Sequence, residues 1–370
     1  MSEPRRIYSI DIFRGLTIGL MILVNNPGSW GHVYAPLRHA QWHGCTLTDL
    51  VFPFFLFLVG ASMRFAFVKW HYYPSPKFHK HLFWRAFSIF MAGWLIHAFP
   101  FIRQDWDWSS FRFMGVLQRI AIAYFISGML IIRYDFKKLL PVIMGILIFY
   151  WGILWFGGTG DPFSLEGNLV RKVDSLLFGA KHLYGGFGIP FDPEGLLSTL
   201  PSIGTVLIGY LMGGMLHTTK NYTDCAKRMA IFGGGLVVLG WIWGFIFPIN
   251  KALWTSSYVL FTGGIATLVL AGLTYLIDIK HWKKPFWVFE VFGTNSIFLF
   301  VASGFWTKTI LAIKMDLDGK SVSAYTYLYQ SIFVPFAGDL NGSILFALTH
   351  VLGFWLMLYW LYRKKIQIKL

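Results

Sequence analysis

The sequence predicts an all-α, polytopic integral membrane protein with about ten transmembrane helices and both termini in the cytoplasm. The chain of 370 residues is 56% hydrophobic and only 13% charged, which is far too apolar for a soluble protein of this length. Apolar stretches of about 20 residues, enough to cross a ~30 Å hydrocarbon core, recur from one end to the other. Lys and Arg gather on one side of these stretches, and this asymmetry predicts the orientation.

We expect ten membrane helices, which together form a single transmembrane domain over residues 1–370. No internal repeat and no low-complexity tract interrupts the series. An even number of crossings places both chain ends on the same side. The expected spans are residues 8–26, 46–68, 82–101, 113–132, 139–157, 199–217, 229–248, 254–277, 286–307 and 343–362.

The net charge of +15 is explained by topology rather than by nucleic-acid binding. On the side of the chain ends, 18 Lys and Arg stand against 4 Asp and Glu, whereas the opposite side carries 10 of each kind. Because cytoplasmic loops carry the excess of Lys and Arg, both termini are predicted to be cytoplasmic. A basic inner face also attracts anions. The expected partners are therefore the lipid bilayer and an anionic ligand, with no nucleic acid.

Three outer connections, near residues 27–45, 158–198 and 308–342, are candidates for function. The last two are long, and long ordered loops usually carry function, although a solvated linker is an equal alternative for the second. Within the third, residues 321–339 are apolar but short for a span. A crossing there would move the basic C-terminus outside, so we expect this segment to be re-entrant or interfacial.

The first outer loop holds His32, His39 and His43 beside Trp42. A histidine titrates near neutrality and can take a proton from an amine or hydroxyl nucleophile, and we choose His39 for this role. One alternative is a zinc site built from all three histidines, but no Cys or carboxylate stands at tight ligand spacing, so no metal is expected. The other alternative is a surface histidine without a task.

Several charged residues fall inside apolar stretches, where an ionised group must be paired, solvated or used. Asp49 stands near the start of the second span. Asp11 and Arg14 are three residues apart, so they share a helix face and can neutralise each other. Arg85 and Arg119 suit phosphate because a guanidinium presents a fixed fork of donors.

Arginines in the interior, together with the basic inner face, suggest a phosphorylated cofactor that enters from the cytoplasm. The alternative is a set of packing ion pairs with Asp49 and Glu290. The residues alone leave two function classes open. An enzyme would use His39 for a transfer across the membrane. A transporter would use the interior charges, Asp11, Arg14, Asp49 and Arg119, as a relay, but the inverted repeats common in transporters are absent from the sequence.

Several sequence blocks resemble the heparan-α-glucosaminide N-acetyltransferase family, including its bacterial members. The similarity runs from the first expected helix to the ninth, and the blocks follow the same order. They are SIDIFRGLTIGLMILVNN (9–26), HAQWHGCTLTDLVFPFFLFLVGASM (39–63), WRAF (84–87), GVLQRIAIAYF (115–125), HLY (182–184), DPEGLLSTLPSIG (192–204) and GTNSI (293–297).

The resemblance implies that an acetyl group passes from cytoplasmic acetyl-CoA, through the membrane, to the amine of a terminal glucosamine on the far side. His39 falls on the family's active-site histidine. Asn25 matches an asparagine at the outer end of the first span. These two residues and Asp49 form the expected catalytic set, with His39 as general base and Asn25 as donor to the developing oxyanion. An acetyl-histidine intermediate is the alternative to direct transfer.

The remaining site residues follow from the same resemblance. We expect Arg14, Arg85, Gln118 and Arg119 to hold the phosphates or the pantetheine of acetyl-CoA. We expect Asp192 and Glu194 to accept bonds from sugar hydroxyls, and Trp42 or Trp108 to stack on the sugar, although most Trp residues near span ends are membrane-interface anchors.

The absence of the additional outer domain and preceding span of the animal enzymes fits a multi-pass protein of the bacterial inner (cytoplasmic) membrane. The resemblance does not specify which amino sugar or glycan end is the acceptor. It leaves a monomer and a homodimer both open.

Overall fold

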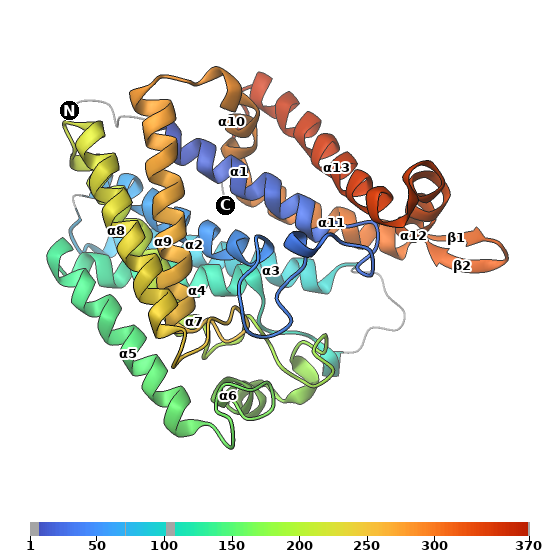
Figure 1. The fold of residues 1–370 in the computed structure, drawn as a ribbon, viewed down its shortest axis with the longest axis horizontal. Coiled ribbons are helices and arrows are strands. Elements are labelled where there is room, and N and C mark those ends of the chain that lie inside the picture. The colour runs from blue at the N-terminus through green and yellow to red at the C-terminus, as the bar shows by residue number, and fades with distance from the viewer. Residues whose placement is uncertain (1–6, 71, 101–107, 369–370) are drawn as a thin grey trace.

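The computed structural model describes residues 7–70, 72–100 and 108–368, and the regular secondary structure of this part of the chain is almost entirely helical (Figure 1). The longer helices are α1 (Tyr8–Asn25), α2 (Val51–Ala66), α3 (Pro76–Ala98), α4 (Val116–Arg133), α5 (Leu139–Gly157), α7 (Thr199–Thr218), α8 (Tyr222–Trp243), α9 (Ser256–Leu273), α11 (Ser296–Ala312) and α13 (Val334–Arg363). The shorter helices are α6 (Leu169–Phe178), α10 (Trp287–Thr294) and α12 (Ala324–Leu328).

Eight helical segments of the described residues are long and apolar enough to cross a membrane, and the pair α10 and α11, bent by 70°, would make a ninth. The sequence predicted ten. The remaining expected span coincides with α3, which is a helix of 23 residues. Its polar residues, among them His79, Lys80 and Arg85, lower its hydropathy below that of the other segments.

The regular structure of the described residues is all-helical as expected, apart from strands β1 (Lys314–Leu317) and β2 (Lys320–Ser323), which form one short antiparallel hairpin. Beyond it, residues 324–337 are helical, and the chain turns at Gly338, where φ is 74°. The Tyr329 hydroxyl donates to the Asp339 carbonyl oxygen at 2.9 Å across this turn. The first piece therefore folds back on the second (Figure 1). Its depth in the membrane stays a prediction.

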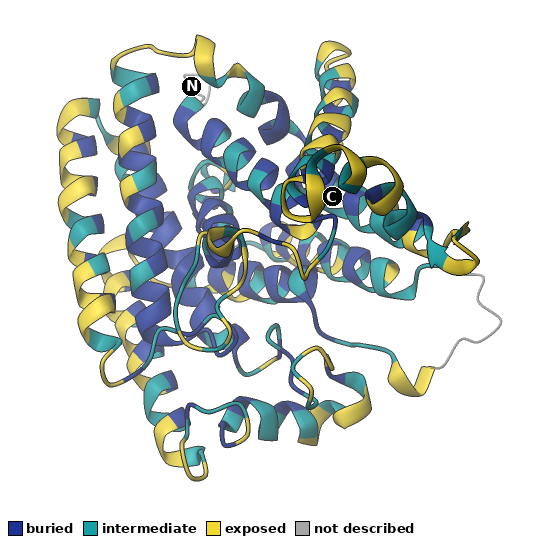
Figure 2. Cartoon of the chain, turned by 45° about the vertical axis from the view of Figure 1, so that its right-hand side comes forward, coloured by how far each residue is buried: buried dark blue, intermediate teal, exposed yellow. Residues whose placement is uncertain are grey.

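Helices α2 and α7 form the centre of the bundle, with 67% and 89% of their apolar segments buried. The corresponding segments of α5 and α8 are only 28% and 33% buried, and their exposed faces lie at the edge of the bundle (Figure 2). These faces carry large apolar side chains such as Phe149, Phe156 and Ile231. A helix that faces lipid has this pattern, since its exposed side needs no polar residues.

Glycines allow the central helices to pack with their backbones in contact. A Cβ atom on Gly60 of α2 would stand 1.8 Å from the Val206 carbonyl oxygen of α7, and one on Gly209 would stand 1.9 Å from the Phe57 carbonyl oxygen. Small residues at such crossings are typical of membrane helices, which gain from close van der Waals contact. The crossing fixes the position of α2, which follows directly after the short turn Thr48–Leu50 that carries Asp49.

The α2–α7 crossing gives a stability test. Gly60→Ala should lower the melting temperature of the detergent-solubilised protein by about 5 °C, because overpacking costs about 1–3 kcal/mol. The control is Gly152→Ala on α5, where a Cβ meets no atom within 4 Å. That variant should melt with the wild-type protein. Melting is monitored by tryptophan fluorescence. Equal melting temperatures for the wild type, Gly60→Ala and Gly152→Ala would contradict the close contact between α2 and α7.

Candidate functional site

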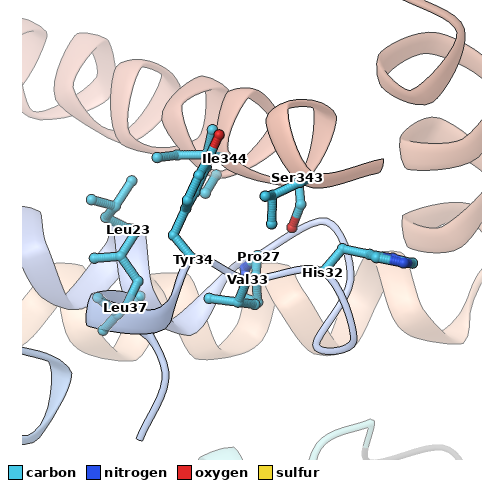
Figure 3. Close-up of a pocket in the computed structure, with 11 residues that line it drawn as sticks. Leu23, Pro27, His32, Val33, Tyr34, Leu37, Ser343 and Ile344 are labelled. Atoms are coloured by element: carbon cyan, nitrogen blue, oxygen red, sulfur yellow. The ribbon is translucent and has the colours of Figure 1, made fainter. Parts of the chain in front are cut away.

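The loop between α1 and α2, residues 26–50, is attached to α13 near its start. The Gly28 amide donates to the Ser343 carbonyl oxygen at 3.2 Å, and the Tyr34 hydroxyl bonds to a side chain of the same helix. Figure 3 shows the small cavity beneath this contact, with His32 at its edge. His32 thus belongs to the attachment of the loop.

Further along, the same loop is attached to two other connections. The Trp42 indole donates to the Phe163 carbonyl oxygen at 2.8 Å. The Gly44 amide donates to the Ile249 carbonyl oxygen at 2.7 Å, and the Asn250 side chain donates to the Trp42 carbonyl oxygen at 2.8 Å. These bonds fix the loop on both sides of His39.

His39 and Asp49 form a hydrogen-bonded pair, with 2.6 Å between His39 Nδ1 and Asp49 Oδ1. A carboxylate only accepts, so Nδ1 carries the proton, and in the neutral imidazole the lone pair is then on Nε2. The other carboxylate oxygen, Oδ2, accepts from the Ala40 and Thr46 amides at 3.0 Å, and the Thr46 hydroxyl oxygen lies at the same distance. Asp49 is buried, whereas the His39 side chain is 43% exposed.

Lys251, from the connection between α8 and α9, completes the cluster. Its Nζ lies 3.1 Å from His39 Nδ1 and 3.6 Å from Asp49 Oδ1. Burial lowers the pKa of the Lys251 ammonium, while Asp49 and Glu194 act in the opposite direction. Asp49 is therefore paired with His39 and Lys251, and the alternative of packing ion pairs between Asp49 and the interior arginines is not what the structure has.

A cavity of about 170 Å³ lies beside this cluster, and we call it the reaction cavity. His39 and Asn25 both line it, which brings together the two residues expected to act on the acetyl group. Most of its wall is apolar, as is usual for ligand pockets. The lining residues are Thr17, Met21, Val24, Asn25, His39, Thr48, Val51, Phe52, Phe55, Val116, Ile120, Glu194, Lys251 and Phe300.

A second, larger cavity of about 630 Å³ lies nearer the chain ends, and we call it the basic cavity. Arg14 and Arg85 both line it. Arg14 donates to Asp11 Oδ1 at 3.1 Å and to Ser62 Oγ at 2.7 Å, which confirms the expected pairing of Asp11 with Arg14. The Nε atom of Arg85 is buried without a partner.

The chain's last described residues form part of the basic cavity. The Asn295 side chain donates to the Ile366 carbonyl oxygen at 3.1 Å and accepts from the Ile368 amide at 2.8 Å. Asn295 and Ile368 both line the cavity. The GTNSI block thus lies at the break between α10 and α11, where Asn295 binds the C-terminal segment that follows α13.

The two cavities share Phe55 of α2 and Ile120 of α4 in their walls. Both side chains are buried, at 8% and 1% exposure. The walls of the basic cavity and the reaction cavity therefore meet at these two apolar side chains, with Arg14 lining the first cavity and His39 the second.

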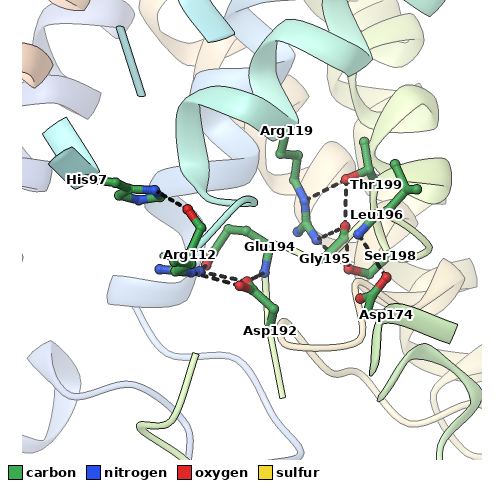
Figure 4. A network of polar contacts seen from close by, with 10 residues as sticks. All are labelled: His97, Arg112, Arg119, Asp174, Asp192, Glu194, Gly195, Leu196, Ser198 and Thr199. Carbon is green, nitrogen blue, oxygen red and sulfur yellow. Dashed lines mark hydrogen bonds and ion pairs between the residues drawn. The ribbon is translucent and has the colours of Figure 1, made fainter. Parts of the chain in front are cut away.

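Gln118 and Arg119 line neither cavity, in contrast to the other two expected cofactor residues. Gln118 is fully buried against Gly93 and Gly115. Arg119 is also fully buried, 4.8 Å from the centre of the Trp254 ring. Its guanidinium bonds to the turn that precedes α7 (Figure 4). Arg119 thus joins α4 to α7.

Asp192 and Glu194 bind Arg112 in the network of Figure 4. Arg112 donates to Asp192 Oδ2 from Nε at 2.7 Å and to Asp192 Oδ1 and Glu194 Oε2 from Nη2 at 2.6 and 2.7 Å. Burial opposes the charged guanidinium, but these bonds outweigh it and raise the pKa of Arg112. Asp192 is fully buried, so only Glu194, which lines the reaction cavity, can reach a ligand there.

The two expected stacking residues lie outside the wall of the reaction cavity. Trp42 packs edge-on against Phe187 and Phe191, with ring centres 5.8 and 5.4 Å apart. Trp108 is 67% exposed and lies 5.7 Å from the Phe111 ring. Trp42 supports the loop that carries His39, whereas Trp108 belongs to the connection between α3 and α4.

Asp174 of α6 binds the turn that precedes α7, in the network drawn in Figure 4. Its Oδ1 accepts from the Leu196 and Leu197 amides at 3.1 and 3.3 Å, whereas Oδ2 is buried without a partner. Burial raises the pKa of the Asp174 carboxyl to about 7, although the two backbone bonds oppose the shift. A Cβ on Gly195 would meet Oδ2 at 1.7 Å, so only glycine fits there.

Three residues of the site carried no sequence signal that singled them out. Lys251 is the only charged residue in a short apolar connection, and Arg112 stands among aromatic residues. Both were counted only as loop charges. Thr48 precedes Asp49, but threonine is common at helix starts. The roles of Arg112 and Lys251 depend on contacts across 80 and 212 residues, which cannot be read from spacing.

Comparison with known proteins places these residues in a family context. The family described as heparan-alpha-glucosaminide N-acetyltransferase, catalytic, matches residues 6–242, and all the predicted site residues lie within that range. The human heparan-alpha-glucosaminide N-acetyltransferase is 28% identical over 355 residues, which cover 80% of this chain and 52% of the human protein. The mouse protein is 28% identical over 360 residues, with 81% and 53% covered. The chain thus spans about half the length of these relatives.

The buried carboxyl of Asp174 gives a pH test of the network. Its pKa of about 7 in the folded protein exceeds the ordinary 3.8, so the folded state holds a proton that the unfolded state lacks. Stability should therefore fall as the pH rises through this window. Asp174→Asn removes the titration, and the melting temperature of the wild type should fall by about 5 °C more than that of the variant. Asp161→Asn, an exposed carboxyl of the same loop, should keep the wild-type slope. Parallel curves for the wild type and Asp174→Asn would contradict the protonated carboxyl.

Proposed function

Because the chain belongs to the catalytic family of heparan-alpha-glucosaminide N-acetyltransferases, we propose that it transfers an acetyl group from acetyl-CoA to the amine of a glucosamine-type sugar. The observation that carries the proposal is the pair of cavities that meet at Phe55 and Ile120. One cavity offers arginines and the other offers a histidine–aspartate pair. The comparisons do not favour the alternative of a transporter.

Acetyl-CoA fits the basic cavity by charge and by unsatisfied donors. Its phosphates need guanidinium or ammonium groups, and Arg85 has a buried Nε without a partner. Arg14 offers donors beyond those that it gives to Asp11 and Ser62. The pantetheine arm would then extend past Phe55 and Ile120 and bring the thioester to the reaction cavity. Since Gln118 and Arg119 line neither cavity, we assign them no contact with the donor.

The chemical step follows from the position of His39. The amine nitrogen of the sugar attacks the thioester carbonyl carbon, and His39 Nε2 removes the amine proton. Asp49 keeps the Nδ1–H in place and stabilises the imidazolium that forms. The C–S bond then breaks, and the CoA thiolate takes the proton from His39. The products are the N-acetyl sugar and free CoA.

Asn25 is the proposed donor to the oxygen that becomes negative during this step, because it shares the reaction cavity with His39. Glu194 is the one carboxylate in the cavity wall and would bind the acceptor. An acetyl-histidine intermediate on Nε2 is the competing route, and a burst of CoA release without acceptor would identify it.

The proposal includes a direction. The excess of Lys and Arg on the side of the chain ends predicts that this side is cytoplasmic, and the basic cavity lies toward it. The reaction cavity lies toward the opposite face, which we propose to be the outside of a bacterial inner membrane. Donor and acceptor would then approach from opposite faces.

A transfer assay in sealed proteoliposomes of one orientation tests this function. Labelled acetyl-CoA supplied at the face of the chain ends should acetylate glucosamine supplied only at the other face. His39→Ala should reduce the rate by about 100- to 10,000-fold, the typical contribution of general base catalysis. His43→Ala, the matched control in the same loop, should keep most of the activity.

Two results would contradict the proposal. Transfer only when both substrates share one compartment would exclude passage through the membrane. Passage of unmodified glucosamine across the membrane without acetylation would instead indicate a transporter.

Binding of the donor provides an independent test of the basic cavity. Acetyl-CoA should raise the melting temperature of the purified protein, because a ligand that binds only the folded state stabilises it. Arg85→Gln should weaken acetyl-CoA binding by about 10- to 100-fold, as expected for charge-assisted bonds. Arg133→Gln, an exposed arginine at the end of α4, should bind normally. A normal affinity in Arg85→Gln would place the phosphates elsewhere.

A further inference from the structure

Thr48 has a buried hydroxyl that the protein leaves without a partner. The residue is 2% exposed, its Oγ1 atom has no hydrogen bond, and its side chain lines the reaction cavity. Buried polar groups are almost always paired, so a hydroxyl that is left unpaired at a cavity wall is available to a ligand.

Two nearby threonines, Thr17 and Thr46, differ from Thr48 because their hydroxyls have hydrogen-bond partners within the protein. Thr17 lines the same cavity, but its hydroxyl donates to the Phe13 carbonyl oxygen of its own helix at 2.8 Å. Thr46 donates to the Arg38 carbonyl oxygen at 2.6 Å and contacts Asp49 Oδ2 at 3.0 Å. Both hydroxyls are thus already engaged by the protein.

The position of Thr48 points to the donor rather than to the sugar. Thr48, Phe52 and Phe55 stand at spacings of four and three residues, so they share one face at the start of α2, and all three line the reaction cavity. Phe55 also belongs to the wall of the basic cavity. Thr48 therefore lies in the 3₁₀ turn Thr48–Leu50 that continues into α2, in line with the residues that lead from the junction of the cavities toward the His39–Asp49 pair.

We propose that the Thr48 hydroxyl is a further catalytic group, which donates a hydrogen bond to the carbonyl oxygen of the acyl thioester. This inference rests on the proposed acetyl transfer. As the amine attacks, the carbonyl π electrons move to that oxygen, which becomes an oxyanion and receives bonds from Thr48 and Asn25. When the C–S bond breaks, the electrons return and the amide carbonyl forms. Thr48 keeps its proton throughout.

The start of α2 adds to this effect. The N-terminal end of a helix carries a partial positive charge, which favours a negative oxygen placed near it. The site would thus surround the oxyanion with a hydroxyl, an amide and a helix end, all fixed before the reaction. Donors that are aligned in advance contribute most to catalysis of acyl transfer.

The test compares Thr48→Val with Thr17→Val. Both replacements keep the side-chain shape and remove one hydroxyl from the same cavity. Thr48→Val should lower kcat by about 100-fold, the usual loss when one oxyanion donor is removed, and Thr48→Ser should restore most of it. Thr17→Val should stay within about twofold of the wild type, because its hydroxyl serves only the helix.

Two measurements without acceptor separate this role from a structural one. Thr48→Val should melt no lower than the wild type, because it removes an unpaired buried hydroxyl. The variant should also lose part of the preference for acetyl-CoA over CoA, since CoA has no acyl carbonyl, while Thr17→Val keeps that preference. Both quantities are measurable by thermal shift and calorimetry even if no sugar is acetylated.

The outcomes are distinguishable. If the wild type transfers no acetyl group, the proposed function fails. If it does, and Thr48→Val is as active as Thr17→Val, the role of Thr48 is refuted. An equal loss of affinity for CoA and acetyl-CoA in Thr48→Val would also refute it, because Thr48 would then hold the pantetheine rather than the acyl oxygen.

Discussion

The hydrogen bond between His39 and Asp49 depends on an arrangement that is costly in a membrane protein, namely a buried carboxylate at the start of a membrane helix. Asp49 is kept there by the Ala40 and Thr46 amides and by Lys251. Each partner comes from the loop or from the α8–α9 connection, so the loop must be held in one position. The attachments through Gly28, Trp42 and Gly44 provide this.

The need to pair a charge that is removed from water also explains the hydrogen bonds around Arg112. A guanidinium that is half-buried beside aromatic rings needs charged hydrogen-bond partners, and Asp192 and Glu194 supply them. Both carboxylates come from the connection that leads into α7, the most buried helix of the bundle. Glu194 is consequently held at the wall of the reaction cavity by its bond to Arg112, a partner that the sequence alone did not indicate.

The helices were predictable from the sequence because apolar length and charge asymmetry are local properties. Asp11 and Arg14 were predictable as a pair for the same reason, since three residues of spacing define a helix face. The contacts of Arg119 could not be predicted, for a physical reason. An arginine in an apolar stretch looks alike whether it faces a ligand or satisfies a turn of another helix, and only the contact with Ser198 distinguishes the two.

Asn25 and His39 were identified by family resemblance, and the shared cavity gives that assignment a spatial basis. The roles of Lys251 and Thr48 could not be predicted in this way. Lys251 reaches His39 across more than two hundred residues of sequence. The free hydroxyl of Thr48 is visible only once the partners of Thr17 and Thr46 are known, because the three residues are chemically the same.

The apolar junction formed by Phe55 and Ile120 has a consequence for the electrical seal of the membrane. A continuous polar passage from one face of the membrane to the other would let ions leak and dissipate the ion gradients on which a cell depends. Apolar side chains at such a junction resist wetting, and ions do not cross a dry constriction. In the transfer that we propose, the uncharged thioester arm would pass the same place. The junction would then let a chemical group through while the bilayer stays closed to protons and salts.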